Sequence, residues 1–335
     1  MTDTDTVLDQ AADWLGAGKG VALATVIGTW GSSPRPVGSQ LAVDDKGAFV
    51  GSVSGGCIEG AVVGEALSTI GDGQIRILDF GVTNEQAWEV GLACGGNIRI
   101  FVERAENRAE LTRLATEKPL ATVTNLSDGN RGFVTPSEIS GDLSLDDDII
   151  AKARLALRDD RSAVHDSGDG ELFVHVHNPP LRMFVVGAVH IAQVLVPMAS
   201  LAGFNVTVAD PRGSFATEDR FPGTTLTEEW PDDALNEFGP DARSAVVTLT
   251  HDPKLDDPAL EVALKSEAFY IGSLGSRRTH AARLERLAEA GFGEQDTARI
   301  NAPIGLDLGS ASPAEIAVSV LAEIIAAKHG KLGAE

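Results

Sequence analysis

A regular alternation of strand-like and helix-like segments after residue 180 most constrains the fold of this chain. The segment LRMFVVGAVHIAQVLVPMASLAGFNVTVADPR runs strand, glycine turn, helix and strand, which is about the length that a parallel βαβ crossover needs. Strand and helix patterns then alternate at 244–250, 259–267, 268–273 and 278–291, and Ser312, Pro313 and Glu315 announce a last helix. The pattern predicts a Rossmann-like, doubly wound parallel sheet over residues 181–335.

The first half of the chain has a mixed α/β pattern. Helix-like spacing occurs at 7–15, 58–70 and 146–158, and strand-like runs occur at 21–28, 74–81, 97–104, 119–126 and 171–177, with a hairpin turn at Lys46-Gly47. Asn178-Pro179-Pro180 interrupts these patterns. We therefore expect a mixed α/β N-terminal domain over residues 1–180, followed by the Rossmann-like domain over residues 181–335.

Charge and composition exclude several classes of partner. The chain carries 49 acidic against 27 basic residues, a net charge of −22, whereas nucleic acids and anionic membranes require basic surfaces. No stretch approaches the roughly 20 apolar residues of a membrane span, and the acidic start lacks the features of a signal peptide. With two cysteines there is no disulfide framework, so we expect a cytoplasmic protein.

The second domain carries an altered dinucleotide fingerprint. Gly187 and Ala192 occupy the first and third positions of the G-x-G-x-x-G/A pattern, but Val189 stands where the second glycine lets the backbone approach a pyrophosphate. Asp210 follows the next strand, where a ribose-binding acid is expected. The fingerprint supports the fold, while NAD(P) binding stays a weaker prediction.

Polar residues follow several strands of this predicted sheet. The carboxyl ends of parallel strands share one edge, where ligands of such sheets gather. Turn chemistry or helix capping explains each such residue separately, but their common edge favours a binding crevice. The candidate ligand-binding residues there are Gly187, His190, Asp210, Arg212, His251 and Arg277.

Both cysteines of the chain lie between glycines in the first domain. GSVSGGCIEG places Cys57 just before a predicted helix, and GLACGG places Cys94 before a predicted strand. If the two loops meet, the sulfur atoms suit a soft metal, a persulfide or a redox disulfide; alternatively, both cysteines are small core residues. The candidate cofactor-binding residues are Cys57 and Cys94, also as metal ligands, with Gly55, Gly56, Gly95 and Arg35.

These motifs resemble the XdhC/CoxI family. The likeness rests on GSSPRPVGSQLAV, GSVSGGCIEG and GLACGG in the first domain, and on FVVGAVHIA, ADPR, THD, GSLGSRRTH and NAPIGLDLGSASPAEIAVSVLAEI in the second. The resemblance implies an accessory factor for molybdenum hydroxylases such as xanthine dehydrogenase and carbon monoxide dehydrogenase. It further implies that Cys57 and Cys94 contact the metal or its sulfur and that Arg35 contacts an anionic group. The family usually has Gly-x-Gly-His where this chain has Val189 before His190.

Three functional hypotheses follow. The leading one is a molybdenum cofactor (molybdopterin) chaperone, a maturation factor rather than an enzyme, that delivers sulfurated cofactor to an apo molybdenum hydroxylase. A cysteine desulfurase would then be a second partner, and a homodimer could close the first-domain site. The alternative is an NAD(P)-dependent oxidoreductase that uses the Rossmann-like domain. The third, an interaction scaffold without a small-molecule ligand, predicts that both cysteines are buried under apolar side chains.

Overall fold

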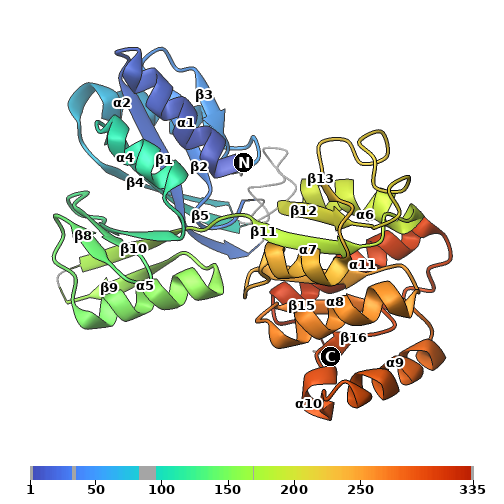
Figure 1. Cartoon of the computed structure of the whole chain (residues 1–335). Helices are drawn as coiled ribbons and strands as arrows, with labels where there is room; N and C mark the ends of the chain where they lie inside the picture. Colours follow the sequence, from blue (N-terminus) through green and yellow to red (C-terminus); the bar gives the residue numbers. More distant parts are fainter. Residues whose placement is uncertain (1–2, 32–34, 83–95, 169, 333–335) are drawn as a thin grey trace. The chain divides into compact units, whose positions relative to one another are not determined.

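The chain forms two compact units, Met1–Pro179 and Pro180–Glu335, which we call the first and second unit (Figure 1). A computed structural model describes residues 3–31, 35–82, 96–168 and 170–332. The first unit is built on antiparallel sheets and the second on a six-stranded parallel sheet. The predicted fold class, a mixed α/β unit followed by a Rossmann-like unit, is confirmed.

Sheet one of the first unit has the strand order β3-β2-β1-β5-β4. Its strands are β1 (Val21–Gly31), β2 (Gln40–Asp44), β3 (Phe49–Gly51), β4 (Arg76–Val82) and β5 (Gly96–Ala105). The expected hairpin is present, because β2 and β3 pair antiparallel around the turn. The register between β1 and β5 shifts between Val26 and Gly28. This irregularity lies where β1 leaves the core and its residues become partly exposed.

Sheet two of the first unit has the order β8-β7-β6-β10-β9. Its strands are β6 (Leu120–Asn125), β7 (Arg131–Val134), β8 (Ile139–Gly141), β9 (Ala163–Ser167) and β10 (Gly170–His177). Strand β9 pairs only with β10 and forms one edge of the sheet. A small apolar cluster joins the two sheets, and its members are Ile27, Phe101, Leu126 and Phe173.

Four described helices cover these sheets: α1 (Asp3–Gly16), α2 (Glu59–Asp72), α4 (Arg108–Thr116) and α5 (Asp147–Asp159). Helices α1 and α4 share one apolar cluster with β1 and β2, whereas α2 packs into a separate cluster with alternate residues of the same strands. Since successive strand residues face opposite sides, sheet one has helices on both faces. Helix α5 covers sheet two. The sequence patterns did not predict α4 or β7 to β9.

The second unit is a doubly wound sheet with the order β13-β12-β11-β14-β15-β16. Its strands are β11 (Leu181–Val186), β12 (Phe204–Ala209), β13 (Thr225–Thr227), β14 (Ser244–Thr248), β15 (Tyr270–Ser273) and β16 (Ile300–Asn301). The chain order reverses between β11 and β14, which is where ligands bind in such sheets. Helices α6 (His190–Leu201) and α11 (Pro313–Lys328) pack into one core. The other core contains α7 (Pro231–Phe238), α8 (Pro253–Lys265) and α9 (Arg277–Glu289), and a short α10 (Glu294–Thr297) follows.

Local signals located the helix ends of the second unit well. Ser312 caps α11, since its side chain accepts a hydrogen bond from the N–H of Glu315 and the Glu315 carboxylate returns one to the cap. This is the predicted capping box with proline in the first turn. Among the described residues, no helix combines the length and the apolar character that a bilayer crossing needs.

Candidate functional site

The turn between β3 and α2 is organised around the buried carboxylate of Glu59. Its Oε1 atom accepts hydrogen bonds from Ser52 Oγ at 2.7 Å and from the N–H of Ser54 at 2.9 Å. Its Oε2 atom accepts from Ser54 Oγ at 2.5 Å and from the N–H of Gly56 at 2.9 Å. The carboxylate therefore holds Ser52 through Gly56 in one backbone conformation.

The hydrogen bonds keep Glu59 ionised although it is only 7% exposed. Burial favours the neutral acid, but the donors from Ser54 and Ser52 outweigh it and lower the pKa of Glu59 to about 2. The negative charge lies at the first residue of α2, where the helix dipole also stabilises it. The sequence analysis did not single out Glu59; the available signal was a glutamate two residues after Cys57, with serines on the other side of the turn.

Cys57 lies at the exposed tip of this turn. Its N–H donates to Ser54 Oγ at 3.1 Å, so its backbone belongs to the same network. Gly55 and Gly56 have φ angles of +77° and +114°, which side chains rarely adopt. A Cβ atom on Gly56 would meet no other atom within 4 Å, so the space beside the cysteine is open. The exposure of Cys57 is opposite to what the scaffold hypothesis predicts for it.

Arg35 lies against the same turn. Its Nε atom donates to the carbonyl oxygen of Ser52 at 3.2 Å, and the Oγ atom of Ser52 accepts from the N–H of Gly55. The structure thus brings together Arg35, Gly55, Gly56 and Cys57, four of the candidates predicted in the first domain. Cys94 and Gly95 lie outside the described residues, so the predicted meeting of the two sulfur atoms stays a prediction.

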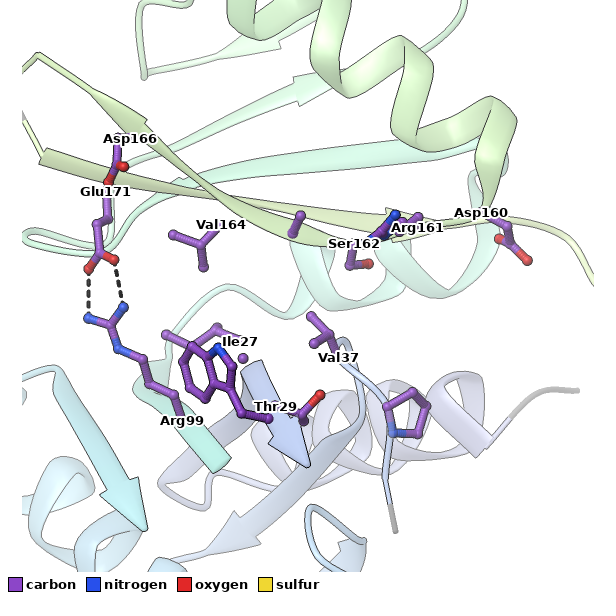
Figure 2. Close-up of a pocket in the computed structure, with 14 residues that line it drawn as sticks. Ile27, Thr29, Val37, Arg99, Asp160, Arg161, Ser162, Val164, Asp166 and Glu171 are labelled. Carbon is purple, nitrogen blue, oxygen red and sulfur yellow. Dashed lines mark hydrogen bonds and ion pairs between the residues drawn. The ribbon is translucent and has the colours of Figure 1, made fainter. Parts of the chain in front are cut away.

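A cavity of about 560 Å³ opens between the two sheets of the first unit (Figure 2). Arg99 of β5 reaches Glu171 of β10 at one end of the cavity, and Asp160 and Arg161 lie toward the other end. The remaining lining residues are Ile27, Gly28, Thr29, Trp30, Pro36, Val37, Ser162, Ala163, Val164 and Asp166. The sequence analysis missed this cavity, because its walls come from strands far apart in the chain.

The second unit brings its strand ends together at the carboxyl edge of the sheet. Gly187 has a φ angle of +102°, and a Cβ atom on it would lie 2.5 Å from Thr250 Cγ2. Glycine is therefore required here, as the fingerprint predicts for the tight turn. Val189 is the N-cap of α6 and makes no side-chain capping bond, and His190 is the exposed first residue of that helix.

Asp210 is completely buried and engaged within the protein. Its Oδ2 atom accepts from the N–H of Ala188 at 2.8 Å, and Arg212 binds both of its oxygens, through Nε at 2.8 Å and Nη2 at 2.7 Å. Burial favours the neutral acid, but Arg212 and the Ala188 N–H lower the pKa of Asp210. The ribose-binding role predicted for this carboxylate therefore finds no support in the structure, and NAD(P) binding is not shown.

His251 and Arg277 lie at the same sheet edge, beyond β14 and at the start of α9. His251 adopts a left-handed φ of +62°, and its N–H donates to Asp256 Oδ2 at 3.1 Å. Arg277 is exposed, after the Ser276 cap of α9. All six candidates of the second unit therefore follow carboxyl ends of strands, as the alternation predicted. Their ligand-binding roles stay predictions.

Within the described parts of the chain, no group of three or more histidine, cysteine or carboxylate side chains is arranged to hold a metal ion. The predicted metal contacts, Cys57 and Cys94, are two, and only the first of them belongs to those parts. The described geometry therefore resembles an open cargo contact more than a closed structural metal site.

Comparison with known proteins shows similarity over both units. Residues 14–81 match the model of the XdhC and CoxI family, and residues 183–324 match the XdhC Rossmann domain. The chain is 29% identical to the molybdenum cofactor insertion chaperone PaoD of Escherichia coli (strain K12), over 96% of this chain and 88% of that protein. It is 30% identical to a protein of Bacillus subtilis (strain 168) named as a probable xanthine dehydrogenase subunit, over 90% and 92%. A crystal structure described as a xanthine dehydrogenase from Bacillus halodurans has a TM-score of 0.78 at 25% identity and covers 100% of this chain and 98% of its own.

Proposed function

Because this chain belongs to the XdhC and CoxI family, we propose that it binds molybdenum cofactor and delivers it to a molybdenum hydroxylase such as a xanthine dehydrogenase. The observation that carries the proposal is the exposed thiol of Cys57 on a turn fixed by Glu59. The name of the Escherichia coli relative, a cofactor insertion chaperone, supports the same role.

The chemistry of the cargo suits this turn. The cofactor carries a soft metal on a dithiolene and a phosphate group; thiolate sulfur is a suitable ligand for the metal, and arginine is a suitable partner for the phosphate. Cys57 and Arg35 flank the same stretch of backbone, since Arg35 contacts Ser52 and Cys57 contacts Ser54. We assign the metal or its sulfur to Cys57 and the anionic group to Arg35. Cys94, with Gly95, is the second proposed contact.

We further assign cofactor handling to residues 1–180, with residues 181–335 as a Rossmann-like partner domain. The delivered form of the cofactor is proposed to be sulfurated, with a cysteine desulfurase as the sulfur donor. An open turn suits a carrier, because the same sulfur must release the cargo to the hydroxylase. A closed set of ligands would hold the metal too tightly for transfer.

The test is co-expression with the cofactor biosynthesis machinery, followed by measurement of molybdenum and molybdopterin in the purified chain. We expect the wild type to retain cofactor and Cys57→Ala and Cys94→Ala each to retain less. Ser68→Ala, on the exposed side of α2, is the matched control and retains the wild-type amount. Cofactor content in the wild type no higher than in the double cysteine variant contradicts the thiolate role.

A further inference from the structure

We propose that the cavity beside Trp30 holds the flat pterin ring system of the cargo, so that the first unit grips the cofactor at two places. This inference rests on the proposed function, which supplies a pterin-containing cargo, and it assigns the ring to residues that no sequence motif marks. The cavity lies between β1 and the 36–37 segment on one side and β9 and β10 on the other (Figure 2).

The shape of the cavity suits a planar ring. Its volume of about 560 Å³ lies within the range of small-molecule sites, roughly 300–1,000 Å³. Ile27 and Val37 face Val164 across it, so its middle is apolar, while charged residues lie toward its two ends (Figure 2). An apolar slot with polar ends accepts a flat heterocycle whose faces are apolar and whose edges form hydrogen bonds.

Trp30 supplies an aromatic surface for stacking. Its side chain is 58% exposed, unusual for a tryptophan whose neighbours belong to a sheet. The indole lies against Gly28, where a Cβ atom would come within 3.1 Å of Trp30 Cη2. Gly28 therefore makes room for the ring and holds it beside the cavity. An exposed, positioned indole stacks well on a second heteroaromatic ring.

The ends of the cavity offer polar contacts for the ring edge. A pterin presents a 2-amino and a 4-oxo group, which require an acceptor and a donor. The side chain of Arg161 forms no hydrogen bond or ion pair in the described parts of the chain, so its guanidinium can donate to the oxo group. Strand β9 has a free edge, and edge strands present unpaired backbone N–H and C=O groups.

One loop connects this cavity to the cysteine turn. Pro36 and Val37 line the cavity, and the preceding residue, Arg35, donates to Ser52 in the turn that carries Cys57. A cofactor with its ring in the cavity would therefore extend along this loop toward the thiol. The chain's own residues hold the ring through Trp30 and Arg161, and Cys57 remains responsible for the metal end.

The test is calorimetric titration of the full chain with pterin-6-carboxylate, a metal-free probe, supported by tryptophan fluorescence. We expect binding to the wild type, with Kd raised about tenfold or more in Trp30→Ala, as expected for loss of one stacking partner. Gly28→Ala, which keeps the indole but displaces it, should weaken binding in the same direction. Trp230→Ala removes a tryptophan that is similarly exposed at 53% but lies in the second unit, and it should leave Kd unchanged.

Arg161→Gln should weaken binding, and Arg158→Gln is its control, because Arg158 is an exposed arginine outside the cavity lining. GMP has the same 2-amino-4-oxo edge as a pterin; equal or tighter binding of GMP would assign the cavity to a guanine nucleotide and overturn the pterin assignment. Absent binding of pterin, or equal Kd in wild type and Trp30→Ala, also overturns it. Molybdenum retained on co-expression despite such a result would leave the proposed function standing, whereas loss of cofactor from the wild type would remove that function itself.

Discussion

Arg99 and Glu171 form a two-pronged ion pair in which both N···O distances are 2.6 Å, and this pair joins the two sheets of the first unit. Arg99 lies on β5 and Glu171 on β10, and the pair closes one end of the cavity (Figure 2). The Glu171 hydrogen bond raises the pKa of Arg99, and the Arg99 guanidinium in turn lowers that of Glu171. The ion pair therefore contributes to the separation and alignment of the cavity walls.

Glu171→Gln should destabilise the first unit by about 1 kcal/mol, because a partly exposed bidentate pair is worth about that much. The loss should shrink in high salt, which screens the pair in the wild type. Urea unfolding at low and high ionic strength measures both effects. Glu117→Gln removes the Arg113 pair on the surface of α4 and is the control; an equal loss in the two variants would mean that Glu171 only forms a surface pair.

Glu59→Gln should cost about 2–3 kcal/mol at pH 7, since the pKa of Glu59 is lowered from 4.5 to about 2 in the folded chain. A depressed folded pKa contributes stability that is present above pH 4.5 and is lost as the pH falls toward 2. The difference between variant and wild type should therefore narrow over that window. Denaturant unfolding at pH 7 and pH 3 measures it.

Hydrogen exchange at Ser54 and Gly56 gives a local readout of the same substitution, because both N–H groups donate to Glu59. Their protection should fall in Glu59→Gln. Glu65→Gln, on the exposed face of the same helix, should leave it unchanged. Full protection at both amides in Glu59→Gln would show that the carboxylate does not hold the turn.

Gly187→Ala should destabilise the second unit more than Gly203→Ala does. Both glycines have positive φ angles, +102° and +89°, so each substitution incurs a strain of about 1–2 kcal/mol. Only at Gly187 would the new Cβ also collide with Thr250, at 2.5 Å, which adds about 1–3 kcal/mol of overpacking. Thermal unfolding of both variants tests the difference, and equal losses would refute the close contact.

Lowering the pH from 6.5 toward 4 should destabilise the first unit through two buried histidines. The rings of His175 and His177 lie 4.3 Å apart. Burial, aided by Arg131, lowers the pKa of His175 to about 4, and burial beside His175 lowers that of His177 well below its usual value. Histidines with lowered folded pKa bind protons on unfolding, so stability is present above pH 6.5 and falls by up to about 1.4 kcal/mol per pH unit for each.

His177→Phe should flatten this pH dependence by removing one titrating group while filling its space. His329→Gln, at an exposed position after α11, is the control and should keep the wild-type slope. Denaturant unfolding at pH 7, 6 and 5 compares the three chains. An unchanged slope in His177→Phe would mean that this histidine already exchanges with solvent in the folded unit.

Helix caps and glycine turns in the second unit were predictable because they depend on neighbouring residues. The Ser312–Glu315 capping box and the glycine turn at Gly187 both occur as the sequence indicated. The role of Asp210 was not predictable in the same way. Its position after β12 suits a ribose contact, but Arg212 and the Ala188 N–H occupy both of its oxygens, and only the folded chain reveals that competition.

The cysteine turn was predictable in part. The glycines around Cys57 indicated an open approach, and the structure shows the exposed residue and the space beside Gly56. The sequence analysis missed Glu59 because charged residues at helix starts are common on surfaces. What distinguishes Glu59 is burial, which depends on the packing of β3 and α2 around it.

The sequence by itself determined the second unit's alternation, the two-part organisation of its patterns and the family, because hydrophobic period, turn residues and motif order are local properties of a chain. Tertiary structure alone decided the cavity beside Trp30, the Arg99–Glu171 bridge and the engagement of Asp210. Arg99 and Glu171 are 72 positions apart, and no local pattern encodes which distant side chains meet. That choice is made when two sheets pack, since only then do charge, volume and burial at the shared surface act together.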